Sequence, residues 1–452
     1  MTRNMTQGSP MRLIIAFGIP LLFGQVFQQL YSIVDTAIVG KILGGDALAA
    51  VGATGPLNTL FIGLGCGTCT GLTIPIAQQM GAGNEKELRR YAANGAFVCG
   101  IFSLILMLIT IPLCGQLLGL LDTPADIFAR SYSYIMVCFI GIPFTMFYNY
   151  VAGILNALGD SRTPVIWMSI ASIINVALDV VFVLYFHMDV VGAALASQIA
   201  QLAALSGCFA KLLRGFPILK MEKADWQWST AHFLRLCRIG LPMGLQTSMI
   251  SLGAAIVQTF VNSLGTDCVT VVTASNALFG LLIYIFYAIG NAMSVYGAQN
   301  VGAGKLERLH EGIRCGMILG TIWSVIMFFF VYFFCEPACM LFLDEGSRHL
   351  LPMCRQFLMA HVWFNVPHVI ILVYRMMIQG MGFTGLATFA GILELIGRAA
   401  VSALTPVLGF IAVCYAAPIS FILADIFLII TYHACYRRLQ RTKAQQLTAS
   451  SC

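Results

Sequence analysis

Charged side chains are scarce in this sequence. Aspartate, glutamate, lysine and arginine make up 10% of the 452 residues, whereas 59% of the residues are apolar and the mean hydropathy is +0.86. A water-soluble domain of this length cannot bury so much apolar surface, so the composition excludes a soluble protein and predicts one that is embedded in lipid. We therefore expect the lipid bilayer to be a partner of this chain.

Groupings of residues that carry out covalent chemistry are also missing. The apolar segments show no nucleophile–base spacing and no cluster of metal ligands, so we do not expect an enzyme. The fifteen cysteines are scattered. Cys66 and Cys69 have the spacing of a metal pair, but they lie in a glycine-rich helix without a nearby histidine, which favours small-residue packing. We expect no resident cofactor and no structural metal.

Long apolar segments are what the sequence has in abundance, and each reaches the roughly 20 residues that a helix needs to cross a bilayer. The sequence predicts an all-α polytopic membrane protein with twelve transmembrane helices in two six-helix bundles. The second and eighth segments are long enough to project beyond the bilayer. The predicted segments are 14–38, 47–76, 91–116, 131–155, 164–186, 190–213, 235–263, 270–299, 311–335, 353–379, 386–410 and 413–436.

The two halves of the chain repeat each other. Gly18-Ile19-Pro20 recurs as Gly240-Leu241-Pro242, and the Gln-Gln-Met-Gly-Ala-Gly of 78–83 recurs as the Gln-Asn-Val-Gly-Ala-Gly of 299–304. Because each copy holds an even number of spans, both enter the membrane from the same side, and we expect a pseudo-twofold axis along the membrane normal. Such duplication is typical of secondary transporters. The predicted domains are an N-terminal lobe at 1–214, a linker at 215–234, a C-terminal lobe at 235–436 and a tail at 437–452.

Two smaller features recur with the repeat. Asp46 and Asp267 each follow a glycine and precede an apolar run, so we expect them to be helix N-caps. The Gly-Ala-Gly turns at 81–83 and 302–304 are expected to cap the ends of the second and eighth spans.

The positive charges predict an orientation. The sequence has 25 lysines and arginines. One of them, Arg398, is assigned to a span. Twenty of them, including Arg375, are assigned to segments on the side of the N-terminus, and four to segments on the other side. These four are Lys41, Arg130, Arg348 and Arg355. This bias predicts a multi-pass protein of the cell (inner) membrane with both termini in the cytoplasm. The net charge of +6 therefore reports topology, and we expect no binding to nucleic acid.

Ionisable residues at membrane depth are costly, at roughly 3 kcal/mol on insertion scales, so each needs an explanation. Along the first span, Gln28, Ser32 and Asp35 have spacings of four and three residues, which place them on one face of a helix. That polar face is expected to line a cavity or to pack on other polar helices. The other ionisable groups at this depth are Asp179, Glu394, Arg398, Asp425, His361 and His368.

The fifth and sixth spans add polar groups to the first lobe. Asn175 and Asp179 are four residues apart and share a helix face, and Ser197 and Gln198 lie on the next span. Together with Asp35 these groups offer hard oxygen ligands for a sodium ion, or two carboxylates that share a proton. The remaining alternative is a hydrogen-bonded packing cluster.

The second lobe carries a different set. Glu394 and Arg398 are four residues apart with the acid first, which favours an internal ion pair that is either structural or part of gating and substrate contact. Asp425 is isolated in sequence. His361 and His368 share a helix face and are interpreted as interior histidines, with a proton relay as the alternative. By this count the spans hold four carboxylates and one arginine. An interior with this negative balance favours the binding of cations.

Together these motifs resemble the multidrug and toxic compound extrusion (MATE) family. The resemblance rests on Gly18-Ile-Pro, Asp35-Thr-Ala-Ile-Val-Gly40, the 78–83 motif, Gly153-Ile-Leu-Asn-Ala-Leu-Gly-Asp-Ser-Arg-Thr-Pro164, and Asn175 with Asp179. It implies a multidrug efflux antiporter that exports amphipathic organic cations in exchange for protons or sodium by alternating access.

The resemblance also implies which residues couple the ion. The family's cation site in the first lobe maps onto Asp35, Asn175, Asp179 and Ser197, with serine where relatives often carry threonine. A transported Na⁺ would contact Asp35, Asn175 and Asp179. Some members use an acid on the seventh span, but this chain has none between Arg235 and Ser263, so coupling through the first lobe is favoured. Gln28, Ser32, Gln198, Glu394 and Arg398 are then candidates for the substrate cavity or a secondary site.

The alternative function is a flippase or exporter of a lipid-linked precursor or metabolite. Such proteins move anionic headgroups and need a cavity rich in arginine and lysine, whereas Arg398 is the one clearly intramembrane cation in the sequence-based assignment. A channel fits the duplicated two-lobe pattern less well than alternating access does. We expect small-molecule organic cations or drugs as partners, and a monomer.

Overall fold

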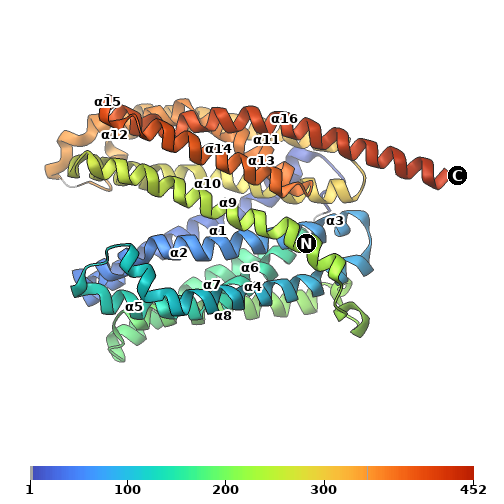
Figure 1. The fold of residues 1–452 in the computed structure, drawn as a ribbon, viewed down its shortest axis with the longest axis horizontal. Coiled ribbons are helices and arrows are strands. Elements are labelled where there is room, and N and C mark those ends of the chain that lie inside the picture. Colours follow the sequence, from blue (N-terminus) through green and yellow to red (C-terminus); the bar gives the residue numbers. More distant parts are fainter. Residues whose placement is uncertain (1–3, 344, 452) are drawn as a thin grey trace. The chain divides into compact units, whose positions relative to one another are not determined.

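The computed structural model describes residues 4–343 and 345–451, and within these ranges it contains helices and no strand. Ten continuous helices are long and apolar enough to cross a membrane, and two further spans are each made of a bent pair of helices. This confirms the predicted all-α membrane protein with twelve spans. Within each unit the helices run side by side (Figure 1).

The first repeat supplies six spans, and two of them contain a short π-helical segment. In chain order they are α1 (Pro10–Ile38) with η1 (Val39–Leu43), α2 (Gly45–Leu72) with α3 (Ile74–Ala82), α4 (Glu85–Leu120), α5 (Ala125–Ile140) with α6 (Ile142–Ala157), α7 (Arg162–Asp179) with η2 (Val180–Tyr185), and α8 (Asp189–Gly215).

The second repeat follows a linker that holds two short 3₁₀ turns, η3 (Pro217–Leu219) and η4 (Lys223–Trp226). Its six spans are α9 (Thr230–Ser263), α10 (Thr266–Gly302), α11 (Glu307–Cys339), α12 (Leu351–Trp363) with α13 (Asn365–Gly380), α14 (Thr384–Ser402) with the short α15 (Thr405–Leu408), and α16 (Phe410–Ser451). The 3₁₀ turn η5 (Glu345–Leu350) precedes α12.

Two spans that the sequence predicts as continuous are bent. The helix pair α5–α6 bends by 44° at Gly141, and α12–α13 bends by 47° at Phe364. Pro143 sits in the first turn of α6, and because proline has no backbone N–H it favours a new helix start over a continuous hydrogen-bond ladder. The second and eighth spans are long, as predicted, with 38 and 37 residues.

The helix starts differ from the sequence prediction. Asp46 and Asp267 are not N-caps, because α2 and α10 begin at the residue before each aspartate. Their N-caps are Gly44 and Gly265, which make no side-chain cap hydrogen bond. Both glycines have positive φ, 89° and 96°, a conformation that disfavours aspartate at that position. The aspartates instead lie in the first helical turn, where a carboxylate favours the helix dipole.

The predicted glycine turns after the second and eighth spans are confirmed. Gly83 is the left-handed C-cap of α3, with φ 69°. Gly304, with φ 68°, lies one residue after the C-cap of α10. Both close a helix end in the conformation that glycine adopts most readily.

Packing divides the chain into two compact units. Unit 1 holds Met1–Asn4 and Ile19–Ser248, and unit 2 holds Met5–Gly18 and Met249–Cys452. The first turns of α1 therefore belong to unit 2, and the first half of α9 belongs to unit 1. The domain boundaries at 214, 234 and 436 describe the sequence repeat and stay a prediction.

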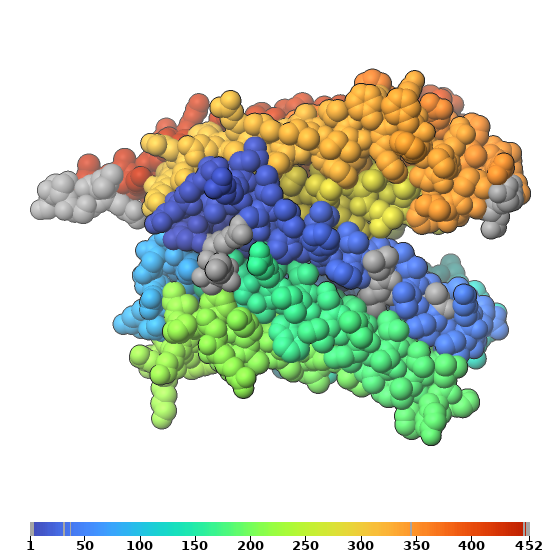
Figure 2. All heavy atoms as spheres, turned by 180° about the vertical axis from the view of Figure 1, so that it is seen from behind, coloured from blue at the N-terminus to red at the C-terminus, as the bar shows by residue number. Residues whose placement is uncertain are grey.

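Hydrogen bonds hold these leading segments in place. The Met5 backbone N–H donates to Gln299 Oε1 at 2.8 Å, and Asn300 Nδ2 donates to the Met5 carbonyl at 3.1 Å. Figure 2 shows this blue N-terminal segment against yellow and orange residues of unit 2. In unit 1 the linker is tied to α4, where Asn94 Oδ1 accepts from the Ser229 N–H at 3.0 Å. The segment that precedes each repeat thus packs on the other repeat.

Candidate functional site

A seam of small residues sets the distance between α7 and α8 in unit 1. Ala171 on α7 and Ala200 and Ala204 on α8 form one buried cluster. At one end of the seam Gly207 lies against the Trp167 ring so closely that a Cβ there would overlap it. Small side chains let helix backbones approach each other closely. Membrane helices depend on such close packing because lipid provides no hydrophobic driving force for their association.

We expect Gly207→Leu to force α8 away from Trp167 and to lower the stability of the folded protein by about 1–3 kcal/mol. The melting temperature of the purified protein in detergent measures this change. Gly119→Leu is the matched control, because Gly119 is exposed and a Cβ there meets no atom within 4 Å. Equal melting temperatures for the two variants would contradict the role of the seam.

The seam brings together polar residues that the sequence predicts as a site. One turn beyond Ala171, Asn175 Nδ2 donates to Ser197 Oγ at 3.2 Å. Asp179 follows one turn later as the last residue of α7, where the helix passes into the π-helical η2. Asn175 and Asp179 are 1% and 0% exposed. Local widening of a helix of this kind is frequent at functional sites.

Asp35 reaches this cluster from α1. A Cβ on Gly24 would lie 2.8 Å from Val165 Cγ2, so α1 and α7 approach closely at that point. Three turns further along α1 the Asp35 carboxyl group, which is half-buried, lies within hydrogen-bonding reach of the Asp179 carboxyl group. Two carboxyl groups in such contact repel each other when both are ionised, so a proton or another cation between them would be stabilising.

Further buried oxygens in this part of unit 1 are without a hydrogen-bond donor. They include Asn175 Oδ1, Gln198 Oε1 and Gln201 Oε1, and Asp35 Oδ1 and both carboxylate oxygens of Asp179 likewise have no donor. The Gln198 side chain lies directly on Gly141, the residue at the bend between α5 and α6. Amide, hydroxyl and carboxylate oxygens are the ligands that hard cations prefer.

The structure places the predicted residues of the first lobe unequally. It brings Asp35, Asn175, Asp179 and Ser197 into one cluster. Gln28 and Ser32 are exposed on α1 and do not join the buried part of that cluster. The function of each residue stays a prediction.

In unit 2 the ion pair between Glu394 and Arg398 is confirmed, with 3.4 Å between Oε2 and Nη2. Sequence reasoning missed a second cation. Arg375 on α13, which the sequence-based topology assigns to a cytoplasmic segment, is 3% exposed and its Nη2 contacts Glu394 Oε1. The count of one intramembrane arginine is therefore wrong, because Glu394 lies between two. The available signal is Glu394 itself, a carboxylate inside the next span, since a buried carboxylate needs cationic partners.

The other ionisable residues of unit 2 are also buried. Asp425 on α16 is 6% exposed. His361 Nδ1 lies 2.9 Å from the Phe357 carbonyl, which makes it the hydrogen-bonded interior histidine that the sequence favours. His368 stacks on Phe421, with 4.7 Å between ring centroids.

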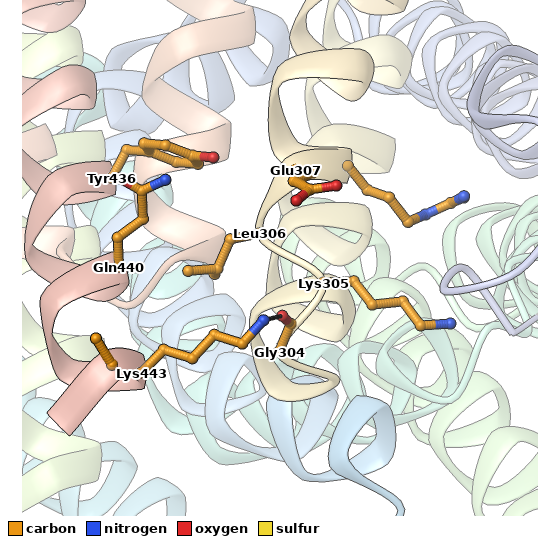
Figure 3. A pocket seen from close by; sticks show the side chains of 9 residues that line it. Gly304, Lys305, Leu306, Glu307, Tyr436, Gln440 and Lys443 are labelled. Atoms are coloured by element: carbon orange, nitrogen blue, oxygen red, sulfur yellow. Dashed lines mark hydrogen bonds between the residues drawn. The ribbon is translucent and has the colours of Figure 1, made fainter. Parts of the chain in front are cut away.

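Two further features lie apart from these clusters. A cavity of about 540 Å³ beside the Gly304 turn is lined by α11 and α16, and Lys443 Nζ donates across it to the Gly304 carbonyl at 2.7 Å (Figure 3). None of the predicted site residues lines it. Cys69 Sγ lies 3.9 Å from Cys99 Sγ, and within residues 4–343 and 345–451 no three metal-ligating side chains are placed to hold a metal ion.

A model of the MatE family matches this chain twice, over residues 20–181 and 242–404. The chain belongs to the MatE family. This confirms the family recognised from the sequence, and the two matches coincide with the two repeats. Transport is the shared property of this family.

Similar proteins agree with this assignment. The probable multidrug resistance protein YoeA of Bacillus subtilis (strain 168) is 27% identical over 369 residues, covering 80% of this chain and 79% of that protein. The probable multidrug resistance protein YpnP of the same strain is 31% identical over 312 residues, covering 68% of each. A crystal structure of MATE in the bent conformation has a TM-score of 0.90 at 21% identity, covering 98% of this chain and 100% of that one, and so shares the fold.

Proposed function

We propose that this MatE protein is a secondary active multidrug exporter that expels amphipathic organic cations in exchange for protons or sodium by alternating access. Relatives named as multidrug resistance proteins support the substrate class. The observation that carries the proposal is the contact between the Asp35 and Asp179 carboxyl groups beside the Asn175–Ser197 hydrogen bond.

Antiport follows from the electrostatics of this cluster. When both carboxylates are ionised and empty they repel each other in a medium of low dielectric constant, so the empty state is unfavourable. A proton shared between Asp35 and Asp179 relieves that repulsion, and so does a sodium ion that Asn175 Oδ1 and Ser197 Oγ help to hold. A cationic substrate is the third way to neutralise the charge. Because any one of these cations suffices, binding of the coupling ion weakens binding of the substrate, and that competition is a coupling free energy.

We place the protein in the cell (inner) membrane with both termini in the cytoplasm. Twelve spans bring the two termini to the same side. The excess of lysine and arginine in segments on that side supports a cytoplasmic assignment, and it remains large after Arg375 is moved into the buried cluster. A cytoplasmic entry and an external exit are the polarity that an exporter needs.

The test is ethidium uptake into inside-out vesicles energised by a proton gradient or by a sodium gradient. Wild-type protein is expected to accumulate dye with one of the two gradients, which identifies the coupling ion, and Asp35→Asn is expected to abolish that accumulation. Asp126→Asn is the matched control, because Asp126 is an exposed carboxylate in the first turn of α5.

Two results would count against the proposal. If wild-type vesicles accumulate no dye with either gradient, export of organic cations is wrong and the alternative of a metabolite or lipid-linked precursor takes its place. If Asp35→Asn inserts at normal levels and accumulates dye as wild type does, Asp35 is not a coupling residue.

A further inference from the structure

We propose that Arg375, Glu394 and Arg398 form a binding site for the carboxylate group of the transported compound. The preferred substrates are then amphipathic zwitterions, which carry a carboxylate as well as the organic cation of the proposed function. This inference rests on that function and narrows its substrate class. We call these three residues the arginine cluster.

The arginine cluster has one carboxylate for two guanidinium groups. Glu394, which is 4% exposed, offers Oε1 to Arg375 and Oε2 to Arg398. Each oxygen of Glu394 therefore lies at ion-pair distance from one of the two arginines. The cluster carries an excess positive charge that one further carboxylate would balance.

Each arginine keeps a donor that the protein does not use. The Nε atoms of Arg375 and Arg398 are buried and have no hydrogen-bond partner, although guanidinium groups favour multiple hydrogen bonds with carboxylates. Native proteins rarely leave a buried charged donor unpaired without a functional reason. Two such donors, on arginines that pair with the same glutamate through their Nη2 atoms, indicate a place for an acceptor from outside the protein.

The remaining acid near the arginine cluster does not fill this place. Asp425 interacts with Arg375 through its charge, but within the described part of the chain no lysine or arginine lies at ion-pair distance from it. The excess positive charge at Glu394 is thus not cancelled by a second ion pair.

Arg398 is the most exposed member of the arginine cluster. Its side chain keeps 12% of its surface exposed, and its Cδ lies 3.3 Å from the position of a Cβ on Gly253 of α9, so a side chain at 253 would crowd it. The half-buried Tyr287 lies near both arginines, and its ring offers an apolar and aromatic surface beside the charges. The combination suits a flat molecule that carries a carboxylate.

The test compares two dyes that differ only at the carboxylate. A rhodamine with a free carboxylate and its methyl ester share the same cationic ring system, and their binding to purified protein in lipid nanodiscs is measured by fluorescence polarisation. Wild-type protein is expected to bind the acid about tenfold more tightly than the ester, which corresponds to about 1.4 kcal/mol. Arg375→Gln is expected to bring the ratio of the two affinities close to one.

Arg355→Gln is the matched control, because Arg355 is exposed and lies over the Tyr332 ring. Its ratio of affinities should equal that of wild type. Since Arg375→Gln leaves Glu394 with one partner fewer, the triple variant Arg375→Gln/Glu394→Gln/Arg398→Gln, which removes the excess positive charge of the arginine cluster, serves if the single variant does not fold. The triple variant should also lose the preference for the acid.

The outcomes separate the two proposals. If wild type binds the ester as tightly as the acid, or if the folded triple variant keeps the preference, the carboxylate site is wrong and export of organic cations stands. If wild type binds neither dye, both the carboxylate site and the proposed drug recognition are overturned.

Discussion

Replacing Asp179 by asparagine is expected to lower gradient-driven export of ethidium by about a hundredfold, equivalent to roughly 2.7 kcal/mol. Asparagine keeps the shape of the side chain and the end of α7, but it neither ionises nor shares a proton with Asp35. The empty cluster then carries one negative charge in place of two, so the repulsion that makes ion and substrate compete is lost. Initial rates of uptake into energised inside-out vesicles measure the effect.

The same variant separates coupling from substrate recognition. Ethidium binding to purified Asp179→Asn in detergent should persist, because one carboxylate remains to neutralise a cation. The response of that binding to the coupling ion should weaken, because the remaining carboxylate lacks a second negative charge beside it. If Asp179→Asn, present in the membrane at the same level as wild type, exports ethidium at the wild-type rate, the carboxyl contact has no part in coupling.

Replacing Glu394 by alanine is expected to lower the stability of the fold by about 3 kcal/mol, because it leaves Arg375 and Arg398 buried without their shared counterion. The two guanidinium groups then repel each other in addition to losing their ion pairs. Thermal melting of the purified protein in detergent measures the loss.

The triple variant Glu394→Ala/Arg375→Leu/Arg398→Leu provides the comparison. Because it removes all three charges and fills the space with apolar groups, it should melt closer to wild type than Glu394→Ala does. If Glu394→Ala has the same melting temperature as wild type, water or lipid already compensates the charges of the two arginines.

Hydropathy was sufficient to predict the twelve spans, because a lipid solvent imposes one simple pattern on every helix that crosses it. The bends at Gly141 and Phe364 escaped prediction because both sit inside segments that stay apolar throughout. In the first lobe, helical spacing placed Asn175 and Asp179 on one face. The small-residue seam brings α7 and α8 together, so their polar faces converge as expected. The spacing of residues along the chain does not predict which two helices become neighbours.

Arg375 escaped prediction for a different reason. It lies five residues before the end of α13 at Gly380, in the stretch where hydropathy cannot separate a buried residue from one in a loop. Its partner, Glu394, lies on the next span and is paired in sequence with Arg398. That local pair already provides the carboxylate with one cation, so the spacing of charged residues does not indicate a second. The predicted N-caps at Asp46 and Asp267 are wrong by two residues, because the caps are Gly44 and Gly265, whose positive φ the sequence pattern does not reveal.

The exchange of leading segments has a consequence for how this chain came to be one polypeptide. Met5–Gly18 packs with the second unit, and the linker and first half of α9 pack with the first. An ancestor with a single set of six helices would have exchanged the same segment between two identical subunits, in the manner of a domain-swapped dimer. Within one polypeptide the exchange takes place between the two repeats. Neither half, if expressed alone, holds every segment that completes its own packing.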